Sequence, residues 1–350
     1  MSKKPLTAAH VATGVGVILG GAVLAATAIY TEIMTSVVAR RRAPFTDALI
    51  AAATKSSDAP IDPEIREKAQ ALLHTPMTQV AIRSKDRYVL RARWYPAEGA
   101  KRTVILAHGW HSCWNVDFSA SAPFLHEQGC NLLFIDQRCH GESGGDLISY
   151  GIKESRDILS WLKWLERHHS GLPVYLCGVS MGAATVLMAT GGEIGNAISG
   201  RVAGVIADCA YSSAQEIIKI TLKKSIGGMA SPTLAAINLN CKLRENFTFG
   251  KYSPLQAMTE NQTIPCLFVH GTEDDFVPWR MTMENYYACR APKDLLLVNG
   301  AGHGVSFLVA PEVYRQKILD FFTVYDKTVT ATPAEEAPTK KARFRKKKSS

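Results

Sequence analysis

The stretch that decides how this chain folds is Val174-Tyr175-Leu176-Cys177-Gly178-Val179-Ser180-Met181-Gly182-Ala183-Ala184. Residues 174–177 are apolar and begin with a β-branched residue, which predicts a buried strand, whereas the alanine-rich residues 183–189 favour a helix. Ser180 therefore falls on a tight bend between a strand and a helix. Gly178 and Gly182 flank the bend, and their missing side chains leave room for the two elements to pass each other.

Such a bend is typical of a nucleophile elbow, in which the serine oxygen projects from the carboxyl edge of a sheet. The backbone amide of Met181, at the start of the helix, points toward the same place. Because a Gly-x-Ser-x-Gly string also arises by chance, the rest of the chain has to supply the context.

Composition predicts a single large domain with extensions. The chain has 350 residues, of which 47% are hydrophobic and 20% charged, and this suits one α/β domain of about 250 residues. Seven of the positive charges behind the net charge of +9 lie in residues 340–348, so the remainder is nearly neutral. This basic tail is expected to be solvated or to contact anionic lipid. Nucleic-acid binding is not expected, because only Phe344 interrupts the basic run.

The eight cysteines are scattered and form no C-x-x-C pair. Cys177, Cys209 and Cys266 lie in or beside apolar runs, which favours buried free thiols in a reducing compartment over disulfides.

Residues 6–31 carry no formal charge. As a helix they would be about 39 Å long, enough to cross a hydrocarbon core of ~30 Å. We expect a single transmembrane helix here, with a cleaved signal peptide and a buried helix as the alternatives. The arginines at positions 40–42 and the free thiols favour a cytoplasmic catalytic domain behind a helical neck at residues 32–77.

From residue 78 onward, strand and helix patterns alternate. Apolar runs predict strands at 79–84, 88–94, 103–107, 131–136, 173–177, 202–207, 265–270 and 294–298, and helices are predicted at 149–168 and 313–322. The alternation predicts an α/β domain over residues 78–326, with a mostly parallel eight-stranded sheet and helices on both faces. Such sheets bind ligands at the carboxyl ends of their strands.

Residues 212–258 interrupt the alternation with amphipathic helical pieces and no strand, which predicts a small helical cap over the strand ends. Residues 327–350 are rich in Thr, Pro, Glu and Lys, and a disordered tail is expected there.

A serine becomes a strong nucleophile only if an imidazole takes its proton and a carboxylate holds that imidazole in one tautomer. In sheets of this class the order along the chain is serine, acid, histidine. Residues 270–278 follow one predicted strand and offer the acid, and His303 follows the last strand and offers the base.

With these motifs in place, residues 78–325 resemble the α/β-hydrolases, in the serine aminopeptidase-like and lipase/esterase-like branch that includes bacterial hydrolases. The matching stretches are His108-Gly109-Trp110, residues 136–143, residues 178–182, Ser253-Pro254, residues 270–278 and Gly302-His303. The resemblance implies that Ser180, Asp274 and His303 are catalytic, with Asp275 as the fallback acid. Asp208, at the end of the strand before the cap, is a rival acid because a carboxylate there can also approach the base. Cys139 stands where the family usually has a glycine.

The same chemistry needs two donors for an oxyanion, and we expect these to be the backbone amides of Met181 and Trp110. His108, His140 and His270 lie in His-Gly motifs, where bracing a turn is the expected role. The sequence contains neither a cluster with metal-ligand spacing nor a phosphate-binding glycine loop. No cofactor and no metal are therefore expected.

These features predict a membrane-anchored serine hydrolase that cleaves carboxylic esters, lipid-derived esters included, through an acyl-enzyme. One alternative is an amidase or peptidase that uses the same residues. The other is a non-catalytic, membrane-tethered binding module.

Overall fold

A computed structural model describes residues 8–40 and 63–326, with side chains described from residue 24 onward in the first range. The predicted tail at 327–350 and the middle of the predicted neck, residues 41–62, lie outside the described residues.

The described residues form one eight-stranded sheet in the order β1-β2-β4-β3-β5-β6-β7-β8. The strands are β1 (Thr78–Arg83), β2 (Val89–Tyr95), β3 (Arg102–Ala107), β4 (Cys130–Ile135), β5 (Val174–Val179), β6 (Val202–Asp208), β7 (Cys266–Gly271) and β8 (Lys293–Val298). Strand β2 pairs antiparallel with β1 and β4, and the strands from β4 to β8 pair in parallel. The predicted mostly parallel sheet is confirmed, and the strand bounds agree within a residue or two.

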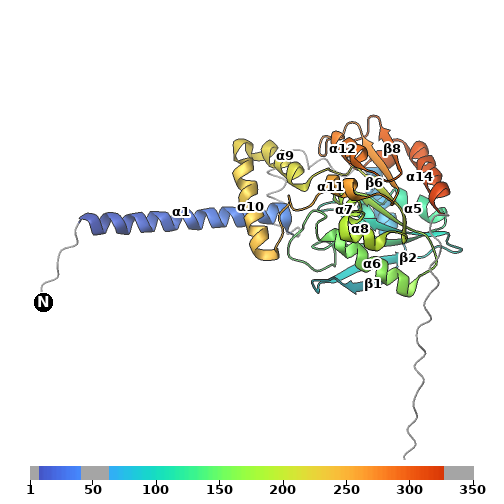
Figure 1. Cartoon of the computed structure of the whole chain (residues 1–350), viewed down its shortest axis with the longest axis horizontal. Helices are drawn as coiled ribbons and strands as arrows, with labels where there is room; N and C mark the ends of the chain where they lie inside the picture. Colours follow the sequence, from blue (N-terminus) through green and yellow to red (C-terminus); the bar gives the residue numbers. More distant parts are fainter. Residues whose placement is uncertain (1–7, 41–62, 327–350) are drawn as a thin grey trace, which may run out of the picture.

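Helices cover both faces of the sheet (Figure 1). On one face the core includes residues of α6 (Glu154–His168), α7 (Met181–Ala189), α8 (Gly192–Ile198) and α11 (Pro254–Glu260), next to α12 (Arg280–Ala288). On the other face it includes residues of α3 (Pro63–Leu73), α4 (Trp114–Asp117), α5 (Ser121–Glu127), α13 (Ser306–Val309) and α14 (Pro311–Tyr325). The central strands β3, β4, β6 and β7 are therefore buried along their whole length.

The interval between β6 and β7 contains α9 (Ala214–Ile226), a 3-10 turn (Gly227–Met229), α10 (Ala230–Glu245) and α11. Helix α11 packs into the core beside α7, through Ala257 and Met258. Helices α9 and α10 instead lie beside the end of α1, away from the sheet (Figure 1). The part of this interval that stands over the strand ends is thus α9 and α10, which we call the cap.

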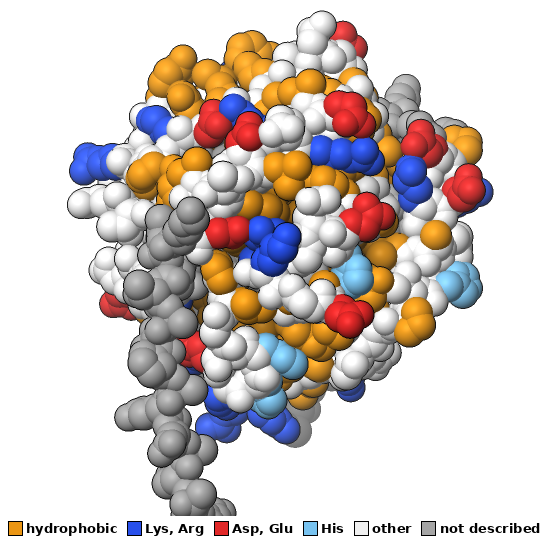
Figure 2. All heavy atoms as spheres, turned by 90° about the vertical axis from the view of Figure 1, so that its right-hand side faces the viewer, with side chains coloured by type: hydrophobic (Ala, Val, Ile, Leu, Met, Phe, Trp, Pro, Cys, Tyr) orange, Lys and Arg blue, Asp and Glu red, His pale blue; other side chains and the backbone are white. Residues whose placement is uncertain are grey.

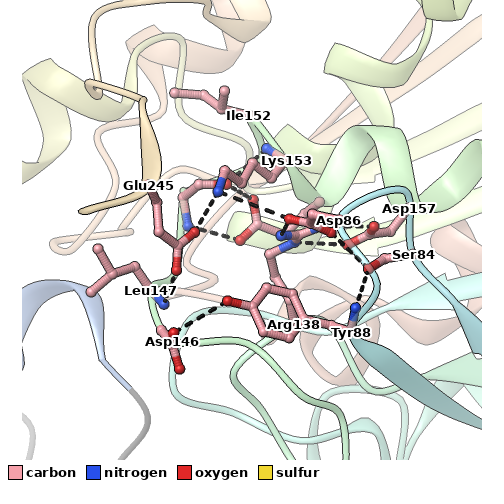
Figure 3. A network of polar contacts seen from close by, with 12 residues as sticks. Ser84, Asp86, Tyr88, Arg138, Asp146, Leu147, Ile152, Lys153, Asp157 and Glu245 are labelled. Atoms are coloured by element: carbon pink, nitrogen blue, oxygen red, sulfur yellow. Dashed lines mark hydrogen bonds and ion pairs between the residues drawn. The ribbon is translucent and has the colours of Figure 1, made fainter. Parts of the chain in front are cut away.

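A polar network, with a buried Arg138 at its centre, ties one end of the cap to the domain (Figure 3). Arg138, in the loop after β4, makes two hydrogen bonds to Asp157 of α6, with N to O distances of 2.8 Å, and pairs with Asp86 at 2.7 Å. Lys153 forms an ion pair with Glu245, the last residue of α10, and Glu245 also accepts a hydrogen bond from the Leu147 amide at 3.1 Å. The C-terminal end of α10 is therefore bonded to the domain.

Helix α1 spans Ala8–Ala39, so it continues past residue 31, where the sequence predicted its end. The first part of the predicted neck is in fact the last two turns of this helix. Among the residues that the structure describes, no helix has both the length and the apolar character that crossing a membrane requires. The predicted transmembrane helix is thus not supported by the described residues.

The thiols and the surface agree with the composition. All eight cysteines are free, and all but Cys113 are buried. The face turned away from α1 mixes acidic, basic and apolar side chains (Figure 2), in keeping with a nearly neutral domain.

Candidate active site

Ser180 lies at the bend between β5 and α7 with φ 55° and ψ −115°, a left-handed backbone that is strained for a serine. The two flanking glycines make this bend possible. A Cβ on Gly178 would lie 2.3 Å from the backbone of Gly182, and a Cβ on Gly182 would lie 1.8 Å from the carbonyl oxygen of Ala107. The predicted steric reason for both glycines is therefore present in the structure.

The three residues predicted to act together do meet, although they lie far apart in the chain. His303 Nε2 lies 2.9 Å from Ser180 Oγ, and His303 Nδ1 lies 2.6 Å from Asp274 Oδ2. His303 is on the loop after β8 and Asp274 is on the loop after β7, so all three side chains are at the carboxyl edge of the sheet. This arrangement can pass a proton from the hydroxyl to the imidazole.

Asp274 is held by four donors. Its Oδ1 accepts from the amides of Phe276 (3.0 Å) and Val277 (2.8 Å), and its Oδ2 accepts from His270 (3.1 Å) and His303. Burial alone would raise the pKa of this carboxyl. The hydrogen bonds from His270 and His303 outweigh burial and hold its pKa well below the usual value. Asp274 is therefore a carboxylate that stabilises a positive charge on His303.

The two other candidate acids are placed differently. Asp275 is exposed, and its carbonyl oxygen accepts a bond from Lys224 Nζ at 2.6 Å. The Asp208 carboxyl accepts bonds from Ser306 Oγ (3.3 Å) and Tyr314 OH (3.1 Å), and burial raises its pKa. Neither carboxylate has a hydrogen bond to His303 among those of the described residues, so Asp274 is the acid that the geometry selects.

Both expected oxyanion donors lie beside the elbow. Met181 is the first residue of α7, so its amide has no partner within the helix. Trp110 follows Gly109, and a Cβ on Gly109 would lie 3.4 Å from the Cβ of Ser180. The loop after β3 thus runs against the serine, next to the helix start.

The other histidines brace loops, as expected. His108 accepts a bond from the Gln137 amide at 3.1 Å, His140 accepts one from the His111 amide at 3.0 Å, and His270 lies 2.6 Å from Thr282 Oγ1. Cys139 adopts φ 63°, so the loop keeps a left-handed residue where the family usually has a glycine.

Cys209, Asp274 and His303 bring three potential metal-ligand atoms within 4.8 Å of one another. Two of these groups are already bonded to each other, and burial raises the pKa of the Cys209 thiol well above its usual value. A thiol ligand must lose its proton to bind a metal. The donor set therefore suits the proton relay better than a metal.

A pocket opens at Ser180, and its lining is almost entirely apolar. The volume of the pocket, counted as the space open to the centre of a water-sized atom, is about 140 Å³. Its lining residues are Ile33, Met34, Val37 and Val38 of α1, Ile217, Ile218, Thr221, Leu222, Ser225 and Ile226 of α9, and Trp110, Tyr150, Tyr211, Ser180 and Phe276. The α1 residues were missed by sequence reasoning, although 33, 34, 37 and 38 are spaced as one apolar helix face.

Comparison with known proteins agrees with the fold described above. A family model described as "Alpha/beta hydrolase family" matches residues 104–317. The chain is 28% identical over 249 residues to the uncharacterized protein YqkD of Bacillus subtilis (strain 168), covering 70% of this chain and 78% of that protein. It is 26% identical over 232 residues to the uncharacterized protein YfhR of Salmonella typhi, covering 64% and 72%.

Among solved structures, the esterase Pf2001 of Pyrococcus furiosus superposes with a TM-score of 0.57 at 21% identity, covering 73% of this chain and 94% of that one. Est1E from Butyrivibrio proteoclasticus, with ferulic acid bound, gives a TM-score of 0.53 at 16% identity, covering 70% and 98%. At these identities the likeness concerns the fold.

Proposed function

The chain belongs to the alpha/beta hydrolase family, and on that premise we propose that it is a serine hydrolase that cleaves carboxylic esters through an acyl-enzyme. The observation that carries this proposal is the run of hydrogen bonds from Ser180 through His303 to Asp274, at the mouth of an apolar pocket. The name of one structural neighbour, the esterase Pf2001 of Pyrococcus furiosus, is in keeping with it.

In the proposed mechanism, His303 Nε2 takes the proton of Ser180 Oγ as that oxygen bonds to the ester carbonyl carbon. The amides of Met181 and Trp110 donate to the oxyanion that forms, and Asp274 stabilises the protonated imidazole. The intermediate collapses, the alcohol leaves with the proton from His303, and Ser180 carries the acyl group. A water molecule that is deprotonated by His303 then releases the acid and restores Ser180.

An amidase or peptidase would use the same three residues, and it is the second candidate. The ester is favoured because none of the described residues that line the pocket carries a charge that could bind the charged end of a peptide. A hydrophobic acyl or alcohol group is the better match to such a lining.

The test is hydrolysis by the full-length chain of p-nitrophenyl esters and, in parallel, of aminoacyl p-nitroanilides. We expect turnover of the esters and its loss in Ser180→Ala. Activity confined to the anilides would replace the esterase by the amidase. Absence of both activities, in a protein that still binds acyl ligands, would favour the non-catalytic binding module.

We also propose that residues 6–31 attach this hydrolase to a membrane, with the catalytic domain in the cytoplasm. Support comes from the charge-free sequence and from the arginines at positions 40–42. The test is carbonate extraction of membranes from cells that express the full chain, with protease added to sealed, right-side-out cells. Release by carbonate would contradict the attachment, and digestion of the basic tail from outside would contradict the orientation.

A further inference from the structure

The pocket at Ser180 has two facing walls from segments that lie almost 200 residues apart. One wall is the apolar face of α1 made by Ile33, Met34, Val37 and Val38, and the other is the apolar face of α9. The α1 wall lies outside the range that the family model matches, which begins at residue 104. One wall of the pocket therefore comes from a part of the chain that the family match does not cover.

The end of α1 is bonded to the loops around the elbow. The carbonyl oxygen of Val38 accepts bonds from Trp110 Nε1 at 3.0 Å and from Tyr150 OH at 2.9 Å, and the carbonyl of Ala39 accepts one from the Ile148 amide at 2.6 Å. The last carbonyls of a helix have no partner within it, so these bonds satisfy groups that would otherwise be left unpaired. Val38 and Ala39 are buried as a result.

A second set of contacts holds the same helix against the cap. Glu32 pairs with Arg244 of α10 at 3.1 Å and accepts a bond from Asn240 Nδ2 at 3.1 Å, and Tyr30 OH lies 2.9 Å from Thr233 Oγ1. Helix α1 is thus fixed on one side to the catalytic loops and on the other to α10. Its pocket-facing residues have a defined position relative to Ser180.

The size and lining of the pocket define a ligand class. A single water needs at least ~10–15 Å³ of such volume. The 140 Å³ available is about ten times that minimum, so the pocket has room for a chain of several methylene groups. An apolar lining with one reactive hydroxyl at its mouth suits an unbranched acyl chain whose carbonyl lies at Ser180.

We propose that α1 forms one wall of an acyl-binding site for medium-length chains, and that Val37 and its neighbours set the preferred chain length. The inference rests on the proposed esterase function for its kinetic readout, and on the pocket alone for its binding readout. It makes the N-terminal helix a specificity element of the hydrolase.

The kinetic test compares full-length wild type with Val37→Trp, which fills the pocket from the α1 side. The control is Ile29→Trp, which places the same ring at an exposed position one turn before Ile33 on the same helix. The readout is the ratio of kcat/KM for p-nitrophenyl octanoate to that for p-nitrophenyl acetate. Burial of one methylene is worth about fourfold, so loss of three methylene contacts lowers this ratio roughly 60-fold in Val37→Trp.

The expected control result is an Ile29→Trp ratio within about threefold of wild type. A Val37→Trp ratio that stays within the same range, in a protein that melts as wild type does, would overturn the inference. If Val37→Trp fails to fold, Val37→Ala decides the question. It widens the site, so the decanoate to octanoate ratio should rise, and an unchanged ratio contradicts the assignment.

Octanoate binding to Ser180→Ala, measured by calorimetry, separates the two proposals. Binding that Val37→Trp weakens in this background supports the α1 wall even if no ester is ever hydrolysed. Ester hydrolysis without any effect of Val37→Trp on chain length or on octanoate binding supports the hydrolase and rejects the wall.

Discussion

Replacement of Asp274 by Asn tests whether the carboxylate fixes the tautomer of His303. An asparagine has one acceptor oxygen and one donor NH₂ group where Asp274 has two acceptor oxygens. If the amide oxygen keeps the bonds from Phe276 and Val277, the NH₂ group faces His303 Nδ1. His303 then carries its proton on Nε2, where it meets Ser180 Oγ and cannot accept the serine proton.

The opposite orientation of the asparagine restores the active tautomer at a cost. It turns the NH₂ group toward two backbone amides and leaves both without an acceptor, at about 1–3 kcal/mol each. A total of about 2–6 kcal/mol corresponds to a population of the active form between about one thirtieth and about one part in 26,000. The expected loss in kcat/KM is thus roughly 30-fold to about 3 × 10⁴-fold, a range that includes the ~10⁴-fold loss seen when a serine protease is altered in this way.

The assay is kcat/KM for a short p-nitrophenyl ester, with thermal melting to establish that the variant is folded. The matched control is Asp275→Asn, because Asp275 is the exposed neighbour on the same loop. The control should stay within about threefold of wild type. A folded Asp274→Asn enzyme with activity within tenfold of wild type would refute the reasoning.

Two further predictions concern stability. Gly182→Ala places a Cβ 1.8 Å from the Ala107 carbonyl oxygen, so we expect the free energy of unfolding in urea to fall by ~3 kcal/mol or more. The control is Gly228→Ala, which has open space around its Cβ and should stay within ~0.5 kcal/mol of wild type. A mild effect of Gly182→Ala would contradict the proposed close packing of the elbow. For Asp86, burial opposes ionisation, but hydrogen bonds from Arg138 and Ser84 lower its pKa from 3.8 to about 2. Its stabilisation is therefore fully present above about pH 4 and is lost as the pH falls toward 2. Because the side chain is 37% exposed, we expect Asp86→Asn to lower the free energy of unfolding by only ~1 kcal/mol at pH 7. The difference from wild type should vanish near pH 2. A difference that does not change with pH would contradict the role of the Asp86–Arg138 pair.

The sequence was sufficient to predict the sheet and the convergence of Ser180, Asp274 and His303, because each depends on a local signal. Gly178 and Gly182 mark a close approach of strand and helix, and the loops after β7 and β8 carry the acid and the base at the edge where parallel strands end. Within the loop after β7, the resemblance to the α/β-hydrolases pointed to Asp274. The structure added the distances and the choice of Asp274 over Asp208 and Asp275.

The bounds of two helices were wrong for physical reasons. Helix α6 begins at Glu154, five residues after the predicted start, because the Glu154 carboxylate accepts bonds from the Ser149 and Gly151 amides and holds those residues in a turn. Helix α1 continues to Ala39, because the domain supplies partners for its last carbonyls. Such partners come from distant parts of the chain and leave no local signal.

The role of Val37 could not be predicted for a related reason. An apolar helix face has the same spacing whether it meets lipid, a core or a substrate, so the pattern at residues 33–38 fixes the face and leaves its partner undetermined. Only the tertiary arrangement places this face opposite α9 and next to Ser180.

The proposed hydrolase requires Ser180 to be a nucleophile that His303 activates. The most direct test of this activation is to treat the full-length protein with a fluorophosphonate and to locate the adduct by peptide mass spectrometry. We expect one adduct, on Ser180, which is absent in Ser180→Ala and forms much more slowly in His303→Ala. An unmodified Ser180 in folded wild-type protein, or an adduct on another residue, would contradict it.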